Sequence, residues 1–272
     1  MNLQNPDDAP DMIAALASLG DLRVWSVIIT IFGDAVRPRG GTVAANTLAA
    51  ITERLSIKPE ALRVALFRLA KDGWITRSKS GRNSYYGLSQ QGLDEFEPAT
   101  RRIYATAAEL RGPWRLVGLQ PQPEAGRSTL EKMMLKAGYV RLSPFHFLGA
   151  EQTGRLPDAA IVIEGKIVDL PDWARMAIAP ADLQSDYAYL AGTLKTFRNH
   201  SKTEDPLMSV ALRTLMIHQW RRLLLRHADL PIIFMPKGWQ GEACRSLVLS
   251  LHDALSDHAD PWLDAQIGPR QG

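Results

Sequence analysis

The sequence has few of the features that secreted, disulfide-bonded or membrane-spanning proteins need. Cys244 is the only cysteine among 272 residues, which excludes an internal disulfide and suits a reducing cytoplasm. We expect it to serve as a small buried hydrophobic residue. No stretch approaches the ~18 uninterrupted apolar residues of a membrane span, and the apolar segment 24–32 lacks the basic leader and cleavage site of a signal peptide. These absences predict a cytoplasmic protein without a membrane partner.

Motifs of common enzymes and metal sites are also absent. Neither Gly-x-Ser-x-Gly nor His-Glu-x-x-His occurs. The six histidines lie far apart, and a single cysteine cannot build a structural zinc site. The loop at Gly40-Gly41 lacks the Gly-x-x-x-x-Gly-Lys spacing of a phosphate-binding loop, so we interpret it as a connecting turn. We expect no catalytic residues, no metal and no cofactor.

What the chain does have is positive charge concentrated between residues 54 and 89. This segment has a net charge of +6, whereas residues 1–53 sum to −3 and residues 90–272 to zero. Its basic residues are Arg54, Lys58, Arg63, Arg68, Lys71, Arg77, Lys79 and Arg82. Such a concentration suits a surface for duplex DNA, because neutralising phosphates releases counterions. A solvated basic face is the alternative interpretation.

The same segment has the pattern of a winged helix-turn-helix. Asn46 or Thr47 can cap a first helix over residues 48–55, and Pro59 suits the first position of a second helix. Gly73 can take the left-handed conformation that ends that helix. Leu62, Ala65, Leu66 and Leu69 form the buried face of the second helix, and residues 74–78 and 84–88 form a hairpin around the polar tip 79–83.

Candidate DNA contacts follow from this layout. Recognition helices present their N-terminal half to base edges, so we place Lys58, Glu60, Ala61 and Arg63 near the groove, with Arg63 as the reader of a guanine. Phe67 shares the helical stripe of Arg63, and Arg68 is either a phosphate ligand or a structural arginine. In the hairpin, Arg77, Lys79 and Arg82 suit backbone phosphates or the minor groove. Tyr85 and Tyr86 alternate across the strand, so only one can face DNA, and Tyr85 is our candidate.

The whole chain is predicted to be a multidomain α+β protein. We expect a winged helix domain over residues 1–90, with residues 1–10 as a mobile tail, and a linker or dimer helix over 91–112. Strand, helix, strand and strand patterns at 114–119, 129–136, 139–142 and 159–168 predict a central ferredoxin-like α+β domain over 113–179. Helical periodicity at 183–199, 206–227 and 240–255 predicts a C-terminal helical domain over 180–272.

Several short motifs follow one another along the chain. They are Phe32-Gly33-Asp34, Arg39-Gly40-Gly41, Arg63 with Phe67-Arg68-Leu69, Gly73-Trp74, Arg82-Asn83-Ser84-Tyr85-Tyr86, Arg101-Arg102-Ile103-Tyr104, Pro113-Trp114 and Pro236-x-x-Trp239-x-Gly241. In this series the chain resembles the PaaX-type repressors of phenylacetic acid degradation. The resemblance implies a winged domain, a ferredoxin-like domain and a helical domain in a homodimer that binds operator DNA. It also implies repression relieved by an aryl-acyl-coenzyme A such as phenylacetyl-coenzyme A.

The chain departs from the family's pattern near its C-terminal end, which leaves the identity of the ligand open. Where the family shows Asp-Pro-x-Leu-Pro and Trp-Pro-Gly, this chain has His227-Ala228-Asp229-Leu230-Pro231 and Trp239-Gln240-Gly241. We place the effector outside the winged domain, in a cleft between the central and C-terminal domains. The candidate effector-binding residues are Trp114, Arg115, His218, Arg221 and Arg222. His218, Arg221 and Arg222 share one helix face, which could instead be an ordinary solvated face.

Two other classes of function stay open. A ferredoxin-like domain also occurs in nucleases, so a metal-dependent nucleic-acid-processing enzyme is one alternative, with Glu164 and Asp169 as its acidic candidates. Divalent-metal-dependent cleavage would favour it. The other alternative is a ligand-independent architectural protein, which no acyl-coenzyme A would release from DNA.

Overall fold

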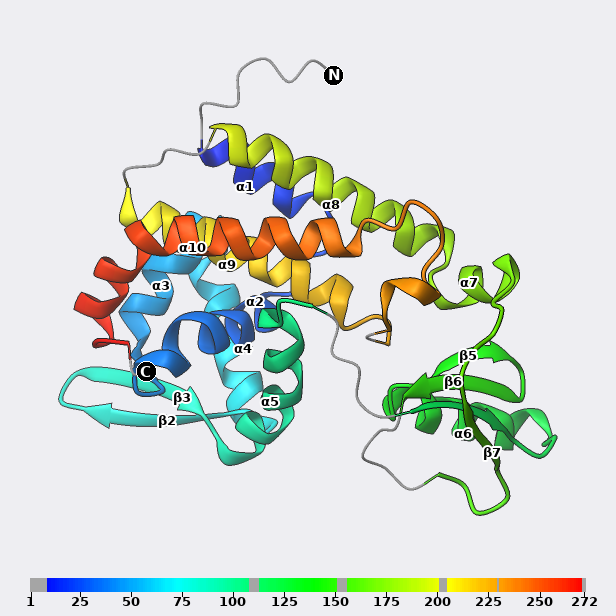
Figure 1. Ribbon diagram of the computed structural model, residues 1–272. Coiled ribbons are helices and arrows are strands. Elements are labelled where there is room, and N and C mark those ends of the chain that lie inside the picture. Colours follow the sequence, from blue (N-terminus) through cyan, green and yellow to red (C-terminus); the bar gives the residue numbers. More distant parts are fainter. Residues whose placement is uncertain (1–8, 108–112, 151–155, 201–204, 229, 271–272) are drawn as a thin grey trace. The chain divides into compact units, whose positions relative to one another are not determined.

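The computed structural model describes residues 9–107, 113–150, 156–200, 205–228 and 230–270 (Figure 1). The protein is an α+β chain, as predicted, and its described residues form two antiparallel sheets. It divides into two compact units. The first comprises Met1–Tyr104, Tyr189–Arg222 and Ala243–Gly272, and the second comprises Ala105–Ala188 and Leu223–Glu242. The domain boundaries expected from the sequence stay a prediction.

The N-terminal part of the first unit alternates helices with short strands. Its elements are α1 (Ala9–Ala17), α2 (Val24–Ile31), β1 (Thr42–Ala44), α3 (Ala45–Arg54), α4 (Pro59–Lys71), β2 (Ile75–Ser80), β3 (Asn83–Leu88) and α5 (Gln90–Tyr104). A π-helical turn, Phe32–Val36, and a 3-10 turn, Arg37–Arg39, follow α2 directly. Residues 1–8 of the expected tail lie outside the described residues, and Ala9 and Pro10 already belong to α1.

Helix α4 has the features that the sequence predicted. Pro59 occupies its first turn, where an N–H would have no intrahelical partner. Its buried residues are Leu62, Ala65, Leu66 and Leu69, as predicted. Gly73 follows the helix with φ of 77°, the left-handed conformation that glycine adopts without a steric penalty. This face packs α4 against α2 and leaves its other face in solvent.

The predicted cap of α3 is wrong. The helix begins at Ala45, and its N-cap residue Ala44 makes no side-chain capping bond. The chain enters α3 directly from β1, so a strand precedes the helix and no polar capping turn is formed. Helix α5 also ends earlier than expected, at Tyr104. The carbonyl of Ile103 accepts a hydrogen bond from the Trp220 indole at 3.0 Å in place of one from a further helical turn.

The first sheet has the order β1-β3-β2, and all pairs are antiparallel. Strands β2 and β3 form a long hairpin that extends from the helices (Figure 1). Ser80 pairs with Asn83, so Gly81 and Arg82 form a two-residue turn. Gly81 has φ of 58°, and glycine at the first central position is typical of the tight turns that match strand twist.

Three long helices complete the chain: α8 (Ala181–His200), α9 (Pro206–Leu224) and α10 (Gly241–Gln266). In α9 every residue from Ser209 to Trp220 is buried, which is typical of a helix surrounded by other elements. Three of its buried polar side chains, Arg213, His218 and Gln219, have hydrogen-bond partners on other elements of the first unit. Gln219 donates to the carbonyl of Leu16 at 2.7 Å, and His218 Nδ1 lies 3.2 Å from Thr30 Oγ1. Helix α9 is therefore the central helix of the first unit.

The second unit contains a four-stranded antiparallel sheet. Its elements are β4 (Trp114–Gly118), α6 (Glu124–Lys136), β5 (Val140–Ser143), β6 (His146–Ala150), β7 (Ile161–Gly165), α7 (Asp172–Ile178) and the 3-10 turn Ile232–Phe234. The strand order is β5-β6-β4-β7. The sequence interpretation missed β6, because it ended the strand pattern before Pro144. The core consists of Val117, Leu119, Met134, Tyr139 and Phe147. Among the described residues, no helix is long and apolar enough to cross a membrane.

Candidate nucleic-acid interface and a pocket in the second unit

The N-terminal half of α4 presents charged side chains to solvent. Lys58 is the exposed N-cap residue, and Ala61 is half-buried. Arg63 and Glu60 form an ion pair at 2.8 Å, with side chains 73% and 70% exposed. An exposed pair of this kind is weak, so Arg63 can exchange Glu60 for another acceptor at little cost.

Apolar side chains on the same helix are also exposed. Phe67 is 70% and Val64 59% exposed, although the opposite face of α4 is buried. Arg68 and Lys71 are exposed too, and Arg68 forms no ion pair with any described residue. The structure therefore brings Arg63, Phe67 and Arg68 to the solvent side of one helix.

The hairpin adds further basic side chains. Lys79 and Arg82 are exposed near its tip, and Arg77 donates to Ser84 Oγ at 2.9 Å and lies over the Tyr86 ring. Tyr85 pairs in register with Ser78, one residue away from both Arg77 and Lys79. Because successive strand residues point to opposite faces, the structure does not bring Tyr85 together with these two cations.

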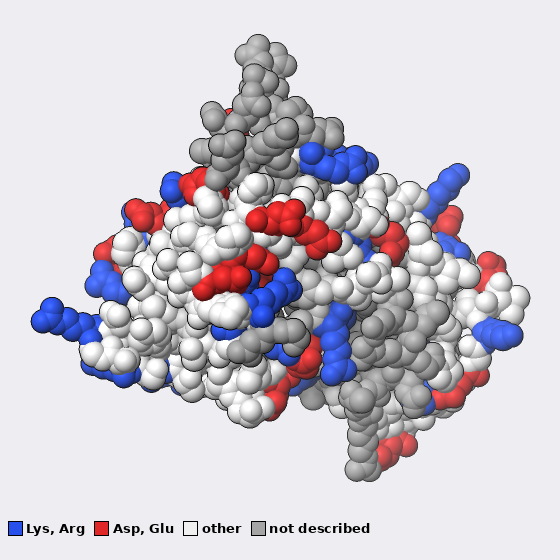
Figure 2. All heavy atoms as spheres, turned by 60° about the vertical axis from the view of Figure 1, so that its left-hand side comes forward, with Lys and Arg blue, Asp and Glu red and all other residues white. Residues whose placement is uncertain are grey.

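We call these exposed residues the helix–hairpin surface: Lys58, Glu60, Arg63, Val64, Phe67, Arg68, Arg77, Lys79 and Arg82. Acidic and basic side chains are intermixed over the face of the protein drawn in Figure 2. Six of the nine residues of the helix–hairpin surface are basic, and one, Glu60, is acidic.

A buried ionic cluster lies in the same unit and was not anticipated from the sequence. Asp34, in the π-helical turn, accepts hydrogen bonds from Arg213 of α9 at 2.8 Å, Tyr104 of α5 at 2.7 Å and His252 of α10 at 2.9 Å. Arg213 also donates to Asp260 at 2.6 Å. The side chains of Asp34 and Arg213 are 2% and 1% exposed. The motif Phe32-Gly33-Asp34 was the only available signal, and it did not reveal the partners of Asp34.

The charges of this cluster stabilise one another. Burial alone raises the pKa of Asp34, but the charge of Arg213 and the hydrogen bonds from His252 and Tyr104 outweigh it and hold the pKa well below its usual range. Burial and the Asp34 charge raise the pKa of Tyr104 well above its usual value. Asp34 is therefore a buried carboxylate whose charge is satisfied by residues from three helices.

Three candidate effector residues lie in the first unit and bind other parts of the protein. Arg221 donates to the Ser26 carbonyl at 3.1 Å and to Thr30 Oγ1 at 3.0 Å, and Arg222 donates to the Leu19 carbonyl. Their helix face is thus packed against neighbouring segments and is not the solvated face that the sequence allowed. His218 is buried. Burial first, and then the charges of Arg221 and Arg222, lower its pKa to about 3.

The other two effector candidates, Trp114 and Arg115, lie in the second unit. Arg115 Nε donates to Glu164 Oε1 at 2.6 Å, so one acidic candidate for metal-dependent cleavage is ion-paired. Among the described residues, no three His, Cys, Asp or Glu side chains gather in a group that could hold a metal. Trp114 belongs to the second unit, whereas His218, Arg221 and Arg222 belong to the first.

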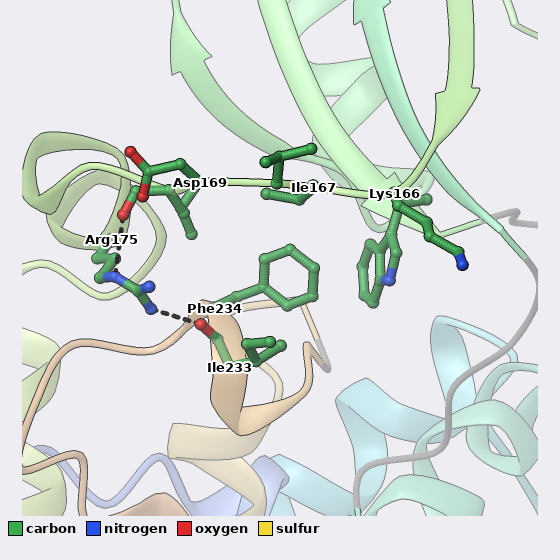
Figure 3. Close-up of a pocket in the computed structure, with 9 residues that line it drawn as sticks. Lys166, Ile167, Asp169, Arg175, Ile233 and Phe234 are labelled. Carbon is green, nitrogen blue, oxygen red and sulfur yellow. Dashed lines mark hydrogen bonds between the residues drawn. The ribbon is translucent and has the colours of Figure 1, made fainter.

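Trp114 lines a pocket of about 340 Å³ in the second unit. The other walls are residues 166–170 after β7, Arg175 of α7, and Ile233 and Phe234. The rings of Trp114 and Phe234 are tilted with centroids 4.1 Å apart. In Figure 3, Ile167 and Phe234 lie in the middle of the lining, with Lys166 at one end and Arg175 at the other. The second acidic candidate, Asp169, belongs to this lining.

These features define a multidomain α+β protein with a basic, exposed helix–hairpin surface, and comparison with known proteins gives its family. Residues 23–92 match the family model described as PaaX-like protein, and residues 180–265 match the PaaX-like protein C-terminal domain. The Transcriptional repressor PaaX of Escherichia coli (strain K12) is 26% identical in an alignment 257 residues long that covers 86% of this chain and 81% of that protein. The chain belongs to the PaaX family.

A solved structure has a similar fold. The uncharacterized protein Rv0674 from Mycobacterium tuberculosis aligns with a TM-score of 0.54, over 87% of this chain and 97% of that chain. The two sequences are 19% identical over this alignment, so the likeness concerns the fold alone.

Proposed function

We propose that this protein is a transcriptional repressor that binds operator DNA through a winged helix-turn-helix formed by α3, α4 and the β2–β3 hairpin. The observation that carries the proposal is the helix–hairpin surface, where exposed cations cluster on the second helix and on the hairpin. The similarity to a protein named as a transcriptional repressor supports the regulatory role. The order β5-β6-β4-β7 supports a ferredoxin-like fold for the second unit, since strands of that fold have this order.

Helix α4 reads the major groove in this proposal. Arg63 leaves Glu60 and donates two hydrogen bonds to a guanine, while Lys58 and Arg68 bind phosphates. Phe67 and Val64 are exposed apolar side chains on the same helix, and they would contact thymine methyl groups, which are the apolar feature of the major groove. Arg77, Lys79 and Arg82 bind backbone phosphates, which fixes the position of the hairpin without reading sequence.

DNA selected from a random pool by the protein itself tests this proposal. Arg63→Ala should cost about 1–3 kcal/mol of binding free energy and relax the preference at one position per half-site. Arg198→Ala removes another exposed arginine, on α8, and should leave the affinity and the selected sequence unchanged. Selection that recovers no common sequence would refute a sequence-specific repressor.

The proposed repressor acts as a homodimer on two related half-sites. Strand β7 lies at an edge of its sheet, and Ile161 and Ile163 on it are 70% and 57% exposed. An exposed apolar edge strand favours pairing with another chain. Two-fold symmetry would separate the half-sites by a whole number of DNA turns, each about 10–10.5 base pairs. Sedimentation should show a dimer at micromolar concentration, and a monomer both free and on DNA would contradict the proposal.

An aryl-acyl-coenzyme A releases the repressor from the operator of an aromatic-acid catabolic gene cluster in this proposal. To do so, the ligand must favour the state that binds DNA poorly. A tenfold loss of operator affinity needs about 1.4 kcal/mol of coupling, and operator DNA must then weaken ligand binding tenfold as well. Titrating phenylacetyl-coenzyme A with and without the selected DNA measures both effects. Equal affinities would reject it as the inducer and favour a ligand-independent DNA-binding protein.

A further inference from the structure

The pocket of the second unit has walls that are fixed by a single side chain. Arg175 Nε donates to the carbonyl of Leu170 at 3.2 Å, and its Nη1 donates to the carbonyl of Met235 at 3.1 Å and to that of Ile233. Leu170 belongs to the segment that follows β7, whereas Ile233 and Met235 belong to the 3-10 turn and its end. One guanidinium therefore joins Leu170 to Met235, which is 65 positions further along the sequence, so the pocket has a defined shape.

The residues in the middle of the pocket lining are apolar, whereas charged residues lie at its ends. The middle is apolar, with Ile167 facing Phe234 (Figure 3). The ring of Trp114 also packs against that of Phe234. At one end stands Lys166, which forms no hydrogen bond or ion pair with any described residue. Lys166 and Arg175 outnumber the single acid of the lining, Asp169. The pocket thus combines a slot for a flat apolar group with an unpaired cation at its end.

The rim of the pocket also exposes apolar surface. Ile233 is 69% exposed and Val168 99% exposed, although both side chains line the pocket. Contact with a ligand would remove part of this apolar surface from water, which is favourable at about 25 cal/mol per Å². Small-molecule sites are mostly apolar concavities of about 300–1,000 Å³ with a few placed polar groups. A volume of about 340 Å³ is at the lower end of this range, enough for an aromatic ring and its acyl carbon atoms.

We infer that this pocket binds the aromatic ring of an anionic ligand, with the ring between Ile167 and Phe234 and the anion paired with Lys166. Two kinds of ligand share this chemistry: a free aromatic acid, whose carboxylate reaches Lys166, and an aryl-acyl thioester, whose phosphate-bearing carrier stays outside the pocket and reaches Lys166 from there. The inference rests on the proposed function, because it identifies the site at which the inducing ligand acts. Arg175 is a positioning residue that holds the walls.

Calorimetric titration of the full-length protein with phenylacetate, coenzyme A and phenylacetyl-coenzyme A tests the inference. Ile233→Asp introduces a negative charge into the lining and should weaken binding at least tenfold. Ile232→Asp is the matched control, because Ile232 is 59% exposed on the same turn but does not line the pocket. Lys166→Ala should also weaken binding tenfold, whereas Lys132→Ala, an exposed lysine of α6, should leave it within about twofold, since surface charges outside a site contribute little.

The outcomes distinguish the inferred ligand site in the pocket from the proposed repressor function. Tight binding of phenylacetate favours the free acid, and binding of phenylacetyl-coenzyme A alone favours the thioester. Equal binding by Ile233→Asp and Ile232→Asp would place the ligand elsewhere while leaving the repressor proposal intact. If Ile233→Asp abolishes ligand binding but the ligand does not change the affinity for the selected DNA, the ligand site in the pocket is supported and the proposed induction by this ligand is refuted. Binding of coenzyme A as tight as that of phenylacetyl-coenzyme A, or no binding of any probe at about 1 mM, would overturn the inference.

Discussion

Replacing Asp34 by asparagine should destabilise the first unit far more than removing a charge from the helix–hairpin surface. The two oxygens of Asp34 accept hydrogen bonds from Arg213, Tyr104 and His252. An asparagine offers one acceptor oxygen and one NH₂ group. Whichever way the amide is turned, its NH₂ group faces either Arg213 or the Tyr104–His252 side. At least one buried donor therefore loses its acceptor.

The expected loss of stability follows from the burial of the Asp34–Arg213 ion pair. Removing one partner of a buried ion pair costs about 3–5 kcal/mol. Arg213 keeps Asp260 at 2.6 Å, so we expect the lower end, about 3 kcal/mol. Because the folded pKa of Asp34 lies below its ordinary value of 3.8, its stabilising contribution is complete above that pH and is lost only as the pH falls through the folded pKa. A measurement at pH 7 therefore records the whole effect.

Urea unfolding followed by circular dichroism measures the loss, with Glu60→Gln as the control. The Glu60–Arg63 pair is exposed, and its removal should cost about 0.5 kcal/mol or less. With a slope of about 1–3 kcal/mol per molar urea, Asp34→Asn should lower the midpoint by about 1 M or more. Hydrogen exchange of peptides from α2 and α9 then assigns the loss to the first unit. Equal midpoints for Asp34→Asn and Glu60→Gln would refute the argument that burial determines the strength of these pairs.

Three further results are expected. Because burial lowers the pKa of His218 in the folded protein to about 3, only the unfolded chain binds a proton at this residue as the pH falls below 6.5. This protonation should lower the free energy of unfolding by about 2 kcal/mol at pH 5. Urea titrations at pH 7 and pH 5 should show that His218→Gln removes this part of the pH dependence. Burial raises the pKa of the Cys244 thiol to about 12, so a disulfide reagent should leave Cys244 of the folded protein unlabelled at pH 8 and modify it only in urea. Rapid labelling of the folded protein would contradict the burial of this side chain. Lys79→Ala should weaken binding to all DNA sequences alike and reduce the slope of log affinity against log salt concentration by about one unit, whereas Lys136→Ala should leave this slope unchanged. A loss of sequence preference in Lys79→Ala would instead mean that Lys79 contacts a base.

Local patterns predicted those elements whose structure is set by near neighbours in the chain. Pro59, the buried face of α4 and the positive φ of Gly73 all follow from positions within one helix and its end. The hairpin was predicted for the same reason, since two strand-forming runs flank Gly81. The exposure of Arg63 could be predicted too, because the opposite face of α4 carries the leucines that must be buried.

Sequence patterns could not predict contacts between segments that are far apart in the chain. Asp34 and Arg213 are 179 positions apart, and no spacing rule connects them. For His218 and Arg221, periodicity showed a shared helix face but could not show that α2 packs against it through Thr30. The sequence therefore allowed an effector site or a solvated face, and the structure shows a packed face.

The position of α9 predicts that changes in the C-terminal part of the chain alter the stability of the helices that carry the helix–hairpin surface. Residues 23–92 and 180–265 match separate family models, yet α9 contributes Arg213, His218 and Gln219 to bonds with the π-helical turn, α2 and α1. Helix α2 packs in turn against α4. A substitution that moves α9 therefore acts first on α2 and the π-helical turn, whose packing supports the buried face of α4. Loss of DNA binding in a variant of α9 is evidence for an effector contact only if the stability of α2 is unchanged, and hydrogen exchange of α2 peptides provides that comparison.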